Sequence, residues 1–332
     1  MPPLCALPAA LRAPTAGRIR RSGRALALRG ALCLTLALAA CVSQSGALHT
    51  SPTPPPKPQI VPNPETVTAA THYRAIEDYY RASGRLRTDS GRRDAPFTAR
   101  QLAGNFMAIA LRDEFSEVGG RLVASNSEDR LHRWDGPIRM SLRFSPSVPP
   151  REQAADRTYV AGFLARLARY SGLRITLTDR APNYIVAVVP PADRRALGPS
   201  ILALDPTTSL AAIRSVTDMA PDVYCTVLAN THDPDPVYVN AFAVVRSELP
   251  DIMRRACYDE EIAQSLGLTN DSPTARPSIF NDDQEFAALT PMDGLMLKML
   301  YDPRLHPGMM PAEARPVVDQ IAAELMGEAP SG

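Results

Sequence analysis

CYDEEIAQSLGLTND, residues 257–271, is the stretch that decides how the fold is interpreted. Glu260 and Gln264 lie four positions apart, so their side chains share one face of a helix. Gly267 predicts the end of that helix, because glycine readily takes the backbone conformation found at helix C-termini. Asn270 follows where the chain can return toward the same face. The stretch therefore gathers polar side chains at the end of one helix.

This spacing resembles the HExxHxxGxxH pattern of the metzincin zinc peptidases. Glu260, Gln264 and Asn270 stand at the three histidine positions. Glu261 stands where those enzymes carry the glutamate that activates the metal-bound water. The resemblance implies a zincin/metzincin-like domain in which Glu261 is the candidate catalytic residue.

The residues at the ligand positions determine which metal could bind. Catalytic zinc sites of this kind use at least two histidines, whereas Glu260, Gln264 and Asn270 offer three oxygens and one negative charge. Such a set suits calcium or magnesium better than zinc. The five histidines are scattered without the i, i+4 spacing of a zinc helix. We therefore expect no zinc cofactor, and calcium or magnesium is the metal alternative.

Other interpretations of this polar set remain open. Glu260, Glu261 and Gln264 could form a solvated helix face. Glu260, Gln264, Asn270 and Asp271 could instead line a cleft that binds a peptide or a glycan. Acid–base hydrolysis of a glycosidic bond by the two glutamates is disfavoured, because adjacent side chains on a helix point about 100° apart.

The remaining pattern predicts an α+β fold with a single mixed sheet and flanking helices. The polar, helix-prone stretch 68–90 and the stretch 97–116, which repeats apolar residues at helical spacing, indicate an N-terminal helical extension over residues 67–129. The globular domain is expected over 130–326, enough for one buried core. Its strands are expected at 138–144, 173–177, 183–189, 224–228 and 237–246, and its helices at 151–171, 249–266, 292–300 and 311–326.

The first 66 residues indicate export and attachment to a membrane. Residues 1–40 contain six arginines, no acidic residue and one ten-residue apolar run, the pattern of a signal peptide. Leu38-Ala-Ala-Cys41 matches the bacterial lipobox, which predicts lipidation of Cys41. Residues 41–66 are rich in proline and predict an extended tether. Because no aspartate follows Cys41, we expect a periplasm-facing lipoprotein of the outer membrane.

Cysteine and charge content narrow the class further. Cys225 and Cys257 are the cysteines left after the signal and the anchor, so an oxidising periplasm favours a disulfide between them. Two buried free thiols are the alternative. The formal net charge of +1 argues against binding to nucleic acid. No GxGxxG or GxxxxGK[ST] motif supports nucleotide binding.

Three phrases carry a second resemblance: EEIAQSLGLTND (260–271), PSIFNDDQEF (277–286) and LTPMDGLMLKMLYDPRLHPGM (289–309). They are similar to a bacterial family known as domain of unknown function 2927, over about residues 100–326. The resemblance implies a secreted or lipid-anchored protein and supplies no activity.

Together these features predict an outer-membrane lipoprotein with a degenerate, non-catalytic metallopeptidase-like domain. It would act as a periplasmic binding or envelope-scaffold module, with the membrane as one partner and a peptide, a glycan or an envelope protein as another. The alternative is a hydrolase of peptide or peptidoglycan that uses Glu261 as general base with an unusual metal.

Overall fold

The computed structural model describes residues 69–232, 234–281 and 283–328. The expected signal peptide (1–40), the lipidation site Cys41 and the tether (41–66) lie outside the described residues.

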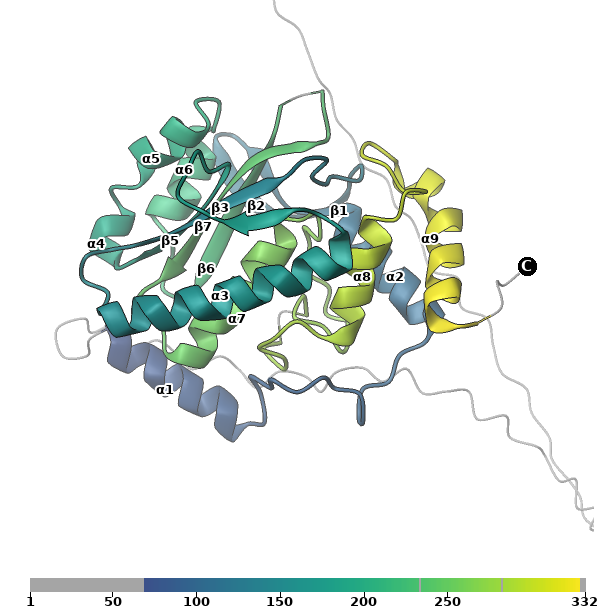
Figure 1. Cartoon of the computed structure of the whole chain (residues 1–332), viewed down its shortest axis with the longest axis horizontal. Coiled ribbons are helices and arrows are strands. Elements are labelled where there is room, and N and C mark those ends of the chain that lie inside the picture. The colour runs from purple at the N-terminus through teal and green to yellow at the C-terminus, as the bar shows by residue number, and fades with distance from the viewer. Residues whose placement is uncertain (1–68, 233, 282, 329–332) are drawn as a thin grey trace, which may run out of the picture. The chain divides into compact units, whose positions relative to one another are not determined.

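A mixed five-stranded sheet forms the centre of the fold, in the order β4-β3-β5-β7-β6 (Figure 1). β4, β3, β5 and β7 run parallel, and β6 pairs antiparallel with β7. All six side chains of β5 are buried, as is usual for a strand covered on both faces of a sheet. The strands are β3 (Ile138–Phe144), β4 (Ile175–Leu177), β5 (Tyr184–Val189), β6 (Cys225–Thr231) and β7 (Tyr238–Arg246).

Helices cover both faces of this sheet. Alternate residues of β5 and β7, such as Tyr184 and Val245, pack in the main core with α3 (Pro150–Ser171) and α7 (Asp251–Gln264). The residues between them, such as Ile185 and Val244, pack in a smaller core on the other face. That core is closed by α5 (Gly198–Leu204) and α6 (Leu210–Thr217), which follow the short α4 (Pro191–Arg194).

The α+β class and the single mixed central sheet are confirmed. The predicted β-α-β-β-β-β-α order is present as β3-α3-β4-β5-β6-β7-α7, with Gly172 closing α3 in the left-handed conformation. The helices α4, α5 and α6 between β5 and β6 were not predicted. Each is eight residues or shorter, so each offers too few turns for a clear helical period.

The segment expected as a helical extension begins with two helices, α1 (Ala69–Ala82) and α2 (Ala99–Ala110). Both bury apolar side chains in the main core, so they belong to the same packed unit as the globular domain. α2 lies beside α9 (Pro311–Met326) and α8 (Pro291–Leu300). On α1, Glu77 Oε2 accepts a hydrogen bond of 3.3 Å from the backbone N–H of Met253, in the first turn of α7.

The end of the expected helix 97–116 was predicted wrongly. α2 ends at Ala110, and residues 112–128 form a separate antiparallel hairpin of β1 (Arg112–Val118) and β2 (Arg121–Glu128). The hairpin is mostly exposed, so its strands lack the apolar alternation that identifies a half-buried strand. Its turn is Gly119-Gly120, and both glycines have positive φ.

Candidate functional site

The candidate site is built on the C-terminal part of α7, which carries Glu260, Glu261 and Gln264. Glu261 is 6% exposed and Gln264 is 8% exposed, whereas Glu260 is half-buried. A fully solvated helix face is therefore not what the structure shows for Glu261 and Gln264. The apolar side chains of α7, among them Tyr258 and Ile262, anchor the helix in the main core.

Gly267 ends this helix region as the sequence predicts. Its backbone N–H donates to the carbonyl oxygen of Gln264 at 2.8 Å, and its φ is +120°. A side chain at this position would run into the carbonyl oxygen of His132 and approach Leu300 Cδ2 to 3.1 Å. Glycine is therefore required here by both backbone conformation and space.

Glu261 lies among acidic groups. Burial raises the pKa of Glu261 well above its usual value, and the negative charges of Glu114 and Asp271 add to the effect. Glu114 belongs to β1 of the hairpin, and Asp271 follows α7. The structure therefore brings the predicted residues Glu261 and Asp271 into one electrostatic cluster, with a third carboxyl group that the sequence did not indicate. Burial and neighbouring negative charges both favour the neutral form of the Glu261 carboxyl group.

Asn270 has a structural task. Its backbone N–H donates to the carbonyl oxygen of Ile109 at 3.0 Å, and its side-chain Nδ2 donates to that of Ala108 at 2.8 Å. Both acceptors lie in the last turn of α2, where carbonyl groups have no partner within the helix. Asn270 thus caps the C-terminus of α2, and its amide is directed at the backbone.

These contacts bear on the expected metal set of Glu260, Gln264 and Asn270. Residues 69–232, 234–281 and 283–328 contain no group of three or more His, Cys, Asp or Glu side chains arranged to hold a metal ion. Glu260, Gln264 and Asn270 would together provide one carboxylate and two amide oxygens, and the Asn270 Nδ2 is bonded to α2. This donor set does not fit zinc.

A second cluster of titratable groups, missed from the sequence, lies at the base of the hairpin. His132 Nε2 is 2.9 Å from Asp129 Oδ2, and His132 Nδ1 is 3.0 Å from the carbonyl oxygen of Pro236. Burial and then the charge of Asp129 raise the pKa of Asp113 to about 6. The pKa of Asp129 is lowered. Burial alone would raise it, but the hydrogen bond with His132 outweighs burial. The sequence did not indicate this cluster, because the expected helix 97–116 included Asp113 and gave no reason to place it near His132.

The pocket nearest to the candidate site lies between α2, the hairpin and the start of α9. Its volume is about 180 Å³. The carbonyl oxygen of Ala108, which accepts from Asn270, belongs to one of its lining residues, and Thr269 Oγ1 donates to the carbonyl oxygen of Arg112, another. The lining combines apolar side chains with two arginines and one glutamate: Gly104, Met107, Ala108, Leu111, Arg112, Glu128, Pro311 and Arg315.

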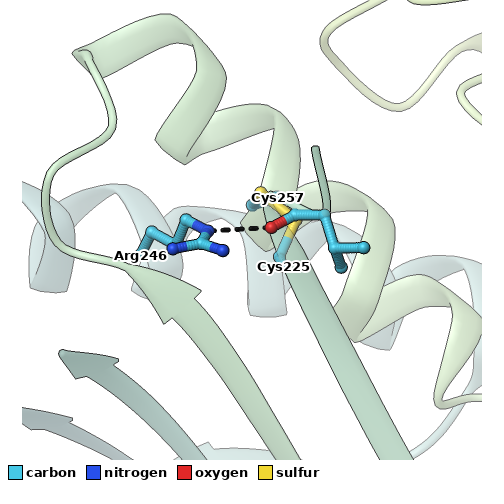
Figure 2. Close-up of a disulfide and its surroundings, with 4 residues drawn as sticks. Cys225, Arg246 and Cys257 are labelled. Atoms are coloured by element: carbon cyan, nitrogen blue, oxygen red, sulfur yellow. Dashed lines mark hydrogen bonds between the residues drawn. A yellow bond between two sulfur atoms is a disulfide. The ribbon is translucent and has the colours of Figure 1, made fainter. Parts of the chain in front are cut away.

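The predicted disulfide is present between Cys225 and Cys257 (Figure 2). It joins the first residue of β6 to the middle of α7, with a Cα–Cα distance of 5.8 Å and a sequence separation of 32. The bond therefore fixes the candidate helix to the antiparallel edge of the sheet. Arg246, at the end of β7, lies beside it in the same view.

The chain belongs to the DUF2927 family, a family described as protein of unknown function, which matches residues 99–320. No curated protein and no solved structure matches the chain. In the part of the chain that the structure describes, no helix is long and apolar enough to cross a membrane.

Proposed function

We propose that this DUF2927 protein is a lipid-anchored envelope protein whose folded domain is a non-catalytic, degenerate metallopeptidase-like module. One observation carries the proposal: the helix end that resembles a peptidase centre is used for structure. Asn270 caps α2, and Glu261 is buried beside acidic groups that raise its pKa. Asn270, at the expected third ligand position, therefore joins the end of α7 to the last turn of α2.

The pocket between α2, the hairpin and α9 supports a binding role. Gly104 and Ala108 leave one side of α2 without large side chains, and Met107 and Leu111 provide apolar contact. Arg112 and Arg315 add positive charge at the pocket. Apolar contact combined with a few polar groups is the usual composition of a binding site. We propose that the pocket receives a short segment of an envelope peptide or of a protein partner, and that the lipid on Cys41 holds the domain at the outer membrane.

The binding role is tested by filling the pocket. A Cβ built on Gly104 meets no atom within 4 Å, so the backbone there accepts a side chain, and Gly104→Leu extends that side chain into the pocket. Gly162→Leu on α3 has the same open surroundings away from this pocket and serves as the control. Site-specific photo-crosslinking from residue 315 in cells should capture a partner with the wild type and with Gly162→Leu, and lose it with Gly104→Leu. Equal crosslinking by all three proteins would refute the assignment.

The hydrolase alternative rests on the raised pKa of Glu261, a property common at catalytic carboxyl groups. It is tested with the purified protein and Glu261→Gln on peptide and peptidoglycan substrates, each with added zinc, calcium or magnesium. We expect no turnover by either protein. Turnover by the wild type that Glu261→Gln abolishes would replace the proposed function with a hydrolase.

Membrane attachment is tested separately. Cys41→Ala should move the protein from the outer-membrane fraction to the soluble periplasmic fraction, because the acyl chains provide the anchor. A variant that stays with the membrane would refute lipidation at Cys41.

A further inference from the structure

A pair of buried arginines lies at the carboxyl ends of two neighbouring parallel strands, β5 and β7. Arg194 ends α4, directly after β5, and is 4% exposed. Arg246 ends β7, which pairs with β5, and is 3% exposed. Crevices outside the carboxyl ends of parallel strands are where open α/β sheets bind ligands.

The guanidinium of Arg246 is well provided with acceptors. Its Nε donates to the carbonyl oxygen of Val223 at 2.8 Å, and its Nη2 donates to that of Ala220 at 2.7 Å. Its Nη1 lies 3.3 Å from Glu248 Oε1. Arg246 is therefore held in place by the backbone of residues 219–223 and by one carboxylate, and its position beside the disulfide is visible in Figure 2.

The guanidinium of Arg194, by contrast, has few hydrogen-bond acceptors. Among the described residues it makes one hydrogen bond, from Nη2 to the carbonyl oxygen of Met219 at 3.3 Å, and Arg246 Nη2 donates to the same oxygen at 3.2 Å. Arg194 Nε and Nη1 are buried and have no hydrogen-bond partner among the described residues. Buried donors without an acceptor are rare in native proteins, and each calls for a missing partner.

The charges point to the nature of that partner. Burial, followed by the like charge of Arg246, lowers the pKa of Arg194. Glu248 is the carboxylate that acts most strongly on Arg194, and it is already paired with Arg246. The phenol of Tyr73 also faces the pair, but it donates its proton to the carbonyl oxygen of Pro221. Two buried cations that share one carbonyl oxygen and one carboxylate are complemented by one more negative charge that accepts hydrogen bonds.

We propose that Arg194 and Arg246 form a binding site for a small oxyanion at the carboxyl ends of β5 and β7. The site is independent of the pocket at α2 and of the function proposed above. Its ligand accepts hydrogen bonds from Arg194 Nε and Nη1 and has the chemistry of phosphate, sulfate or a carboxylate group. Because both arginines are buried, the ligand that reaches them is a small ion or the charged end of a larger ligand.

The test measures thermal unfolding of the purified domain in phosphate, sulfate or acetate, each titrated against chloride at constant ionic strength. An anion at 100 times its Kd should raise the Tm of the wild type by on the order of 5 °C or more. Arg194→Gln should lose this shift. Arg195→Gln is the matched control, because Arg195 is the exposed neighbour and its variant should respond like the wild type. A response to phosphate and sulfate identifies a tetrahedral anion, and a response to acetate alone identifies a carboxylate.

A second measurement guards against a variant that folds poorly. Arg194→Lys keeps the charge but loses the planar set of donors, so calorimetric titration with the responding anion should show binding about tenfold weaker or more. In chloride, Arg194→Met should melt no lower than the wild type, since it removes a buried cation without a partner. The proposal is overturned if no anion raises the Tm of the wild type above that in chloride, or if Arg194→Gln responds as the wild type does.

Discussion

Gly267→Ala should be among the most destabilising single-methyl changes in the chain. Gly267 has a φ of +120°, which residues with a Cβ adopt only under strain of roughly 1–3 kcal/mol. The added Cβ would overlap the backbone carbonyl oxygen of His132, which cannot rotate away, and would lie 3.1 Å from Leu300 Cδ2. Overpacking of this kind costs about 1–3 kcal/mol more. We expect a total loss of unfolding free energy of about 2–6 kcal/mol.

Urea unfolding followed by circular dichroism measures this loss, and thermal unfolding should show a Tm lower by on the order of 10 °C. Gly162→Ala in α3 is the control, because its Cβ meets nothing within 4 Å. It should stabilise the helix by about 0.5–1 kcal/mol. If Gly267→Ala unfolds within about 1 kcal/mol of the wild type, the close approach of residue 267 to the carbonyl group of His132 is not a constraint on the fold.

Three further changes test other parts of the structure. Replacing Cys225 and Cys257 together by serine should lower the unfolding free energy by about 3–4 kcal/mol, the chain-entropy value for their separation of 32 residues. Asp156→Ala should cost about 3–5 kcal/mol, because Asp156 accepts hydrogen bonds from the buried Arg254 and would leave that charge without its closest anion. The raised pKa of Asp113, about 6, means that its proton stabilises the folded state below pH 4 and that this contribution is lost as the pH rises through 6. Asp113→Asn should therefore gain stability relative to the wild type by about 1 kcal/mol between pH 4 and pH 7.5, a value reduced for partial exposure.

Denaturant titrations check all three. If the serine double variant is as stable as the wild type under oxidising conditions, the disulfide between β6 and α7 does not stabilise the fold. Asp156→Asn is the comparison for Asp156→Ala, since it retains an acceptor oxygen and should lose less stability. A difference between Asp113→Asn and the wild type that does not change with pH would show that Asp113 does not titrate in this range.

The elements of the central domain were predictable because their buried faces produce a regular spacing of apolar residues in the sequence. The strand Ile138–Phe144 and the helix Pro311–Met326 have the bounds that the sequence suggested. Both bury one face, and the polar residues between mark the period. The hairpin Arg112–Glu128 has no such spacing, because most of its side chains are exposed on both faces. Its usable signal was the Gly119-Gly120 pair between two short polar runs, which is typical of a tight hairpin turn.

The helix that carries the candidate site residues was predictable, whereas their partners from distant segments were not. The spacing correctly placed Glu261 and Gln264 near the end of one helix that is closed around Gly267. It could not reveal that Glu114 of the hairpin joins Glu261, because the two lie far apart in sequence. It also could not reveal the cap that Asn270 provides for α2, since side-chain to backbone contacts between distant segments carry no sequence pattern.

The helix α1 has a practical consequence for experiments on this protein. The family match begins at residue 99, after the helix that contributes Tyr73, Ile76 and Tyr80 to the main core and lends Glu77 to the start of α7. A recombinant fragment trimmed to the match would open the interior to solvent beneath α7 and truncate α9 as well. Insolubility of such a fragment would then say nothing about the intact protein, so recombinant versions should start upstream of Ala69 and continue through Met326.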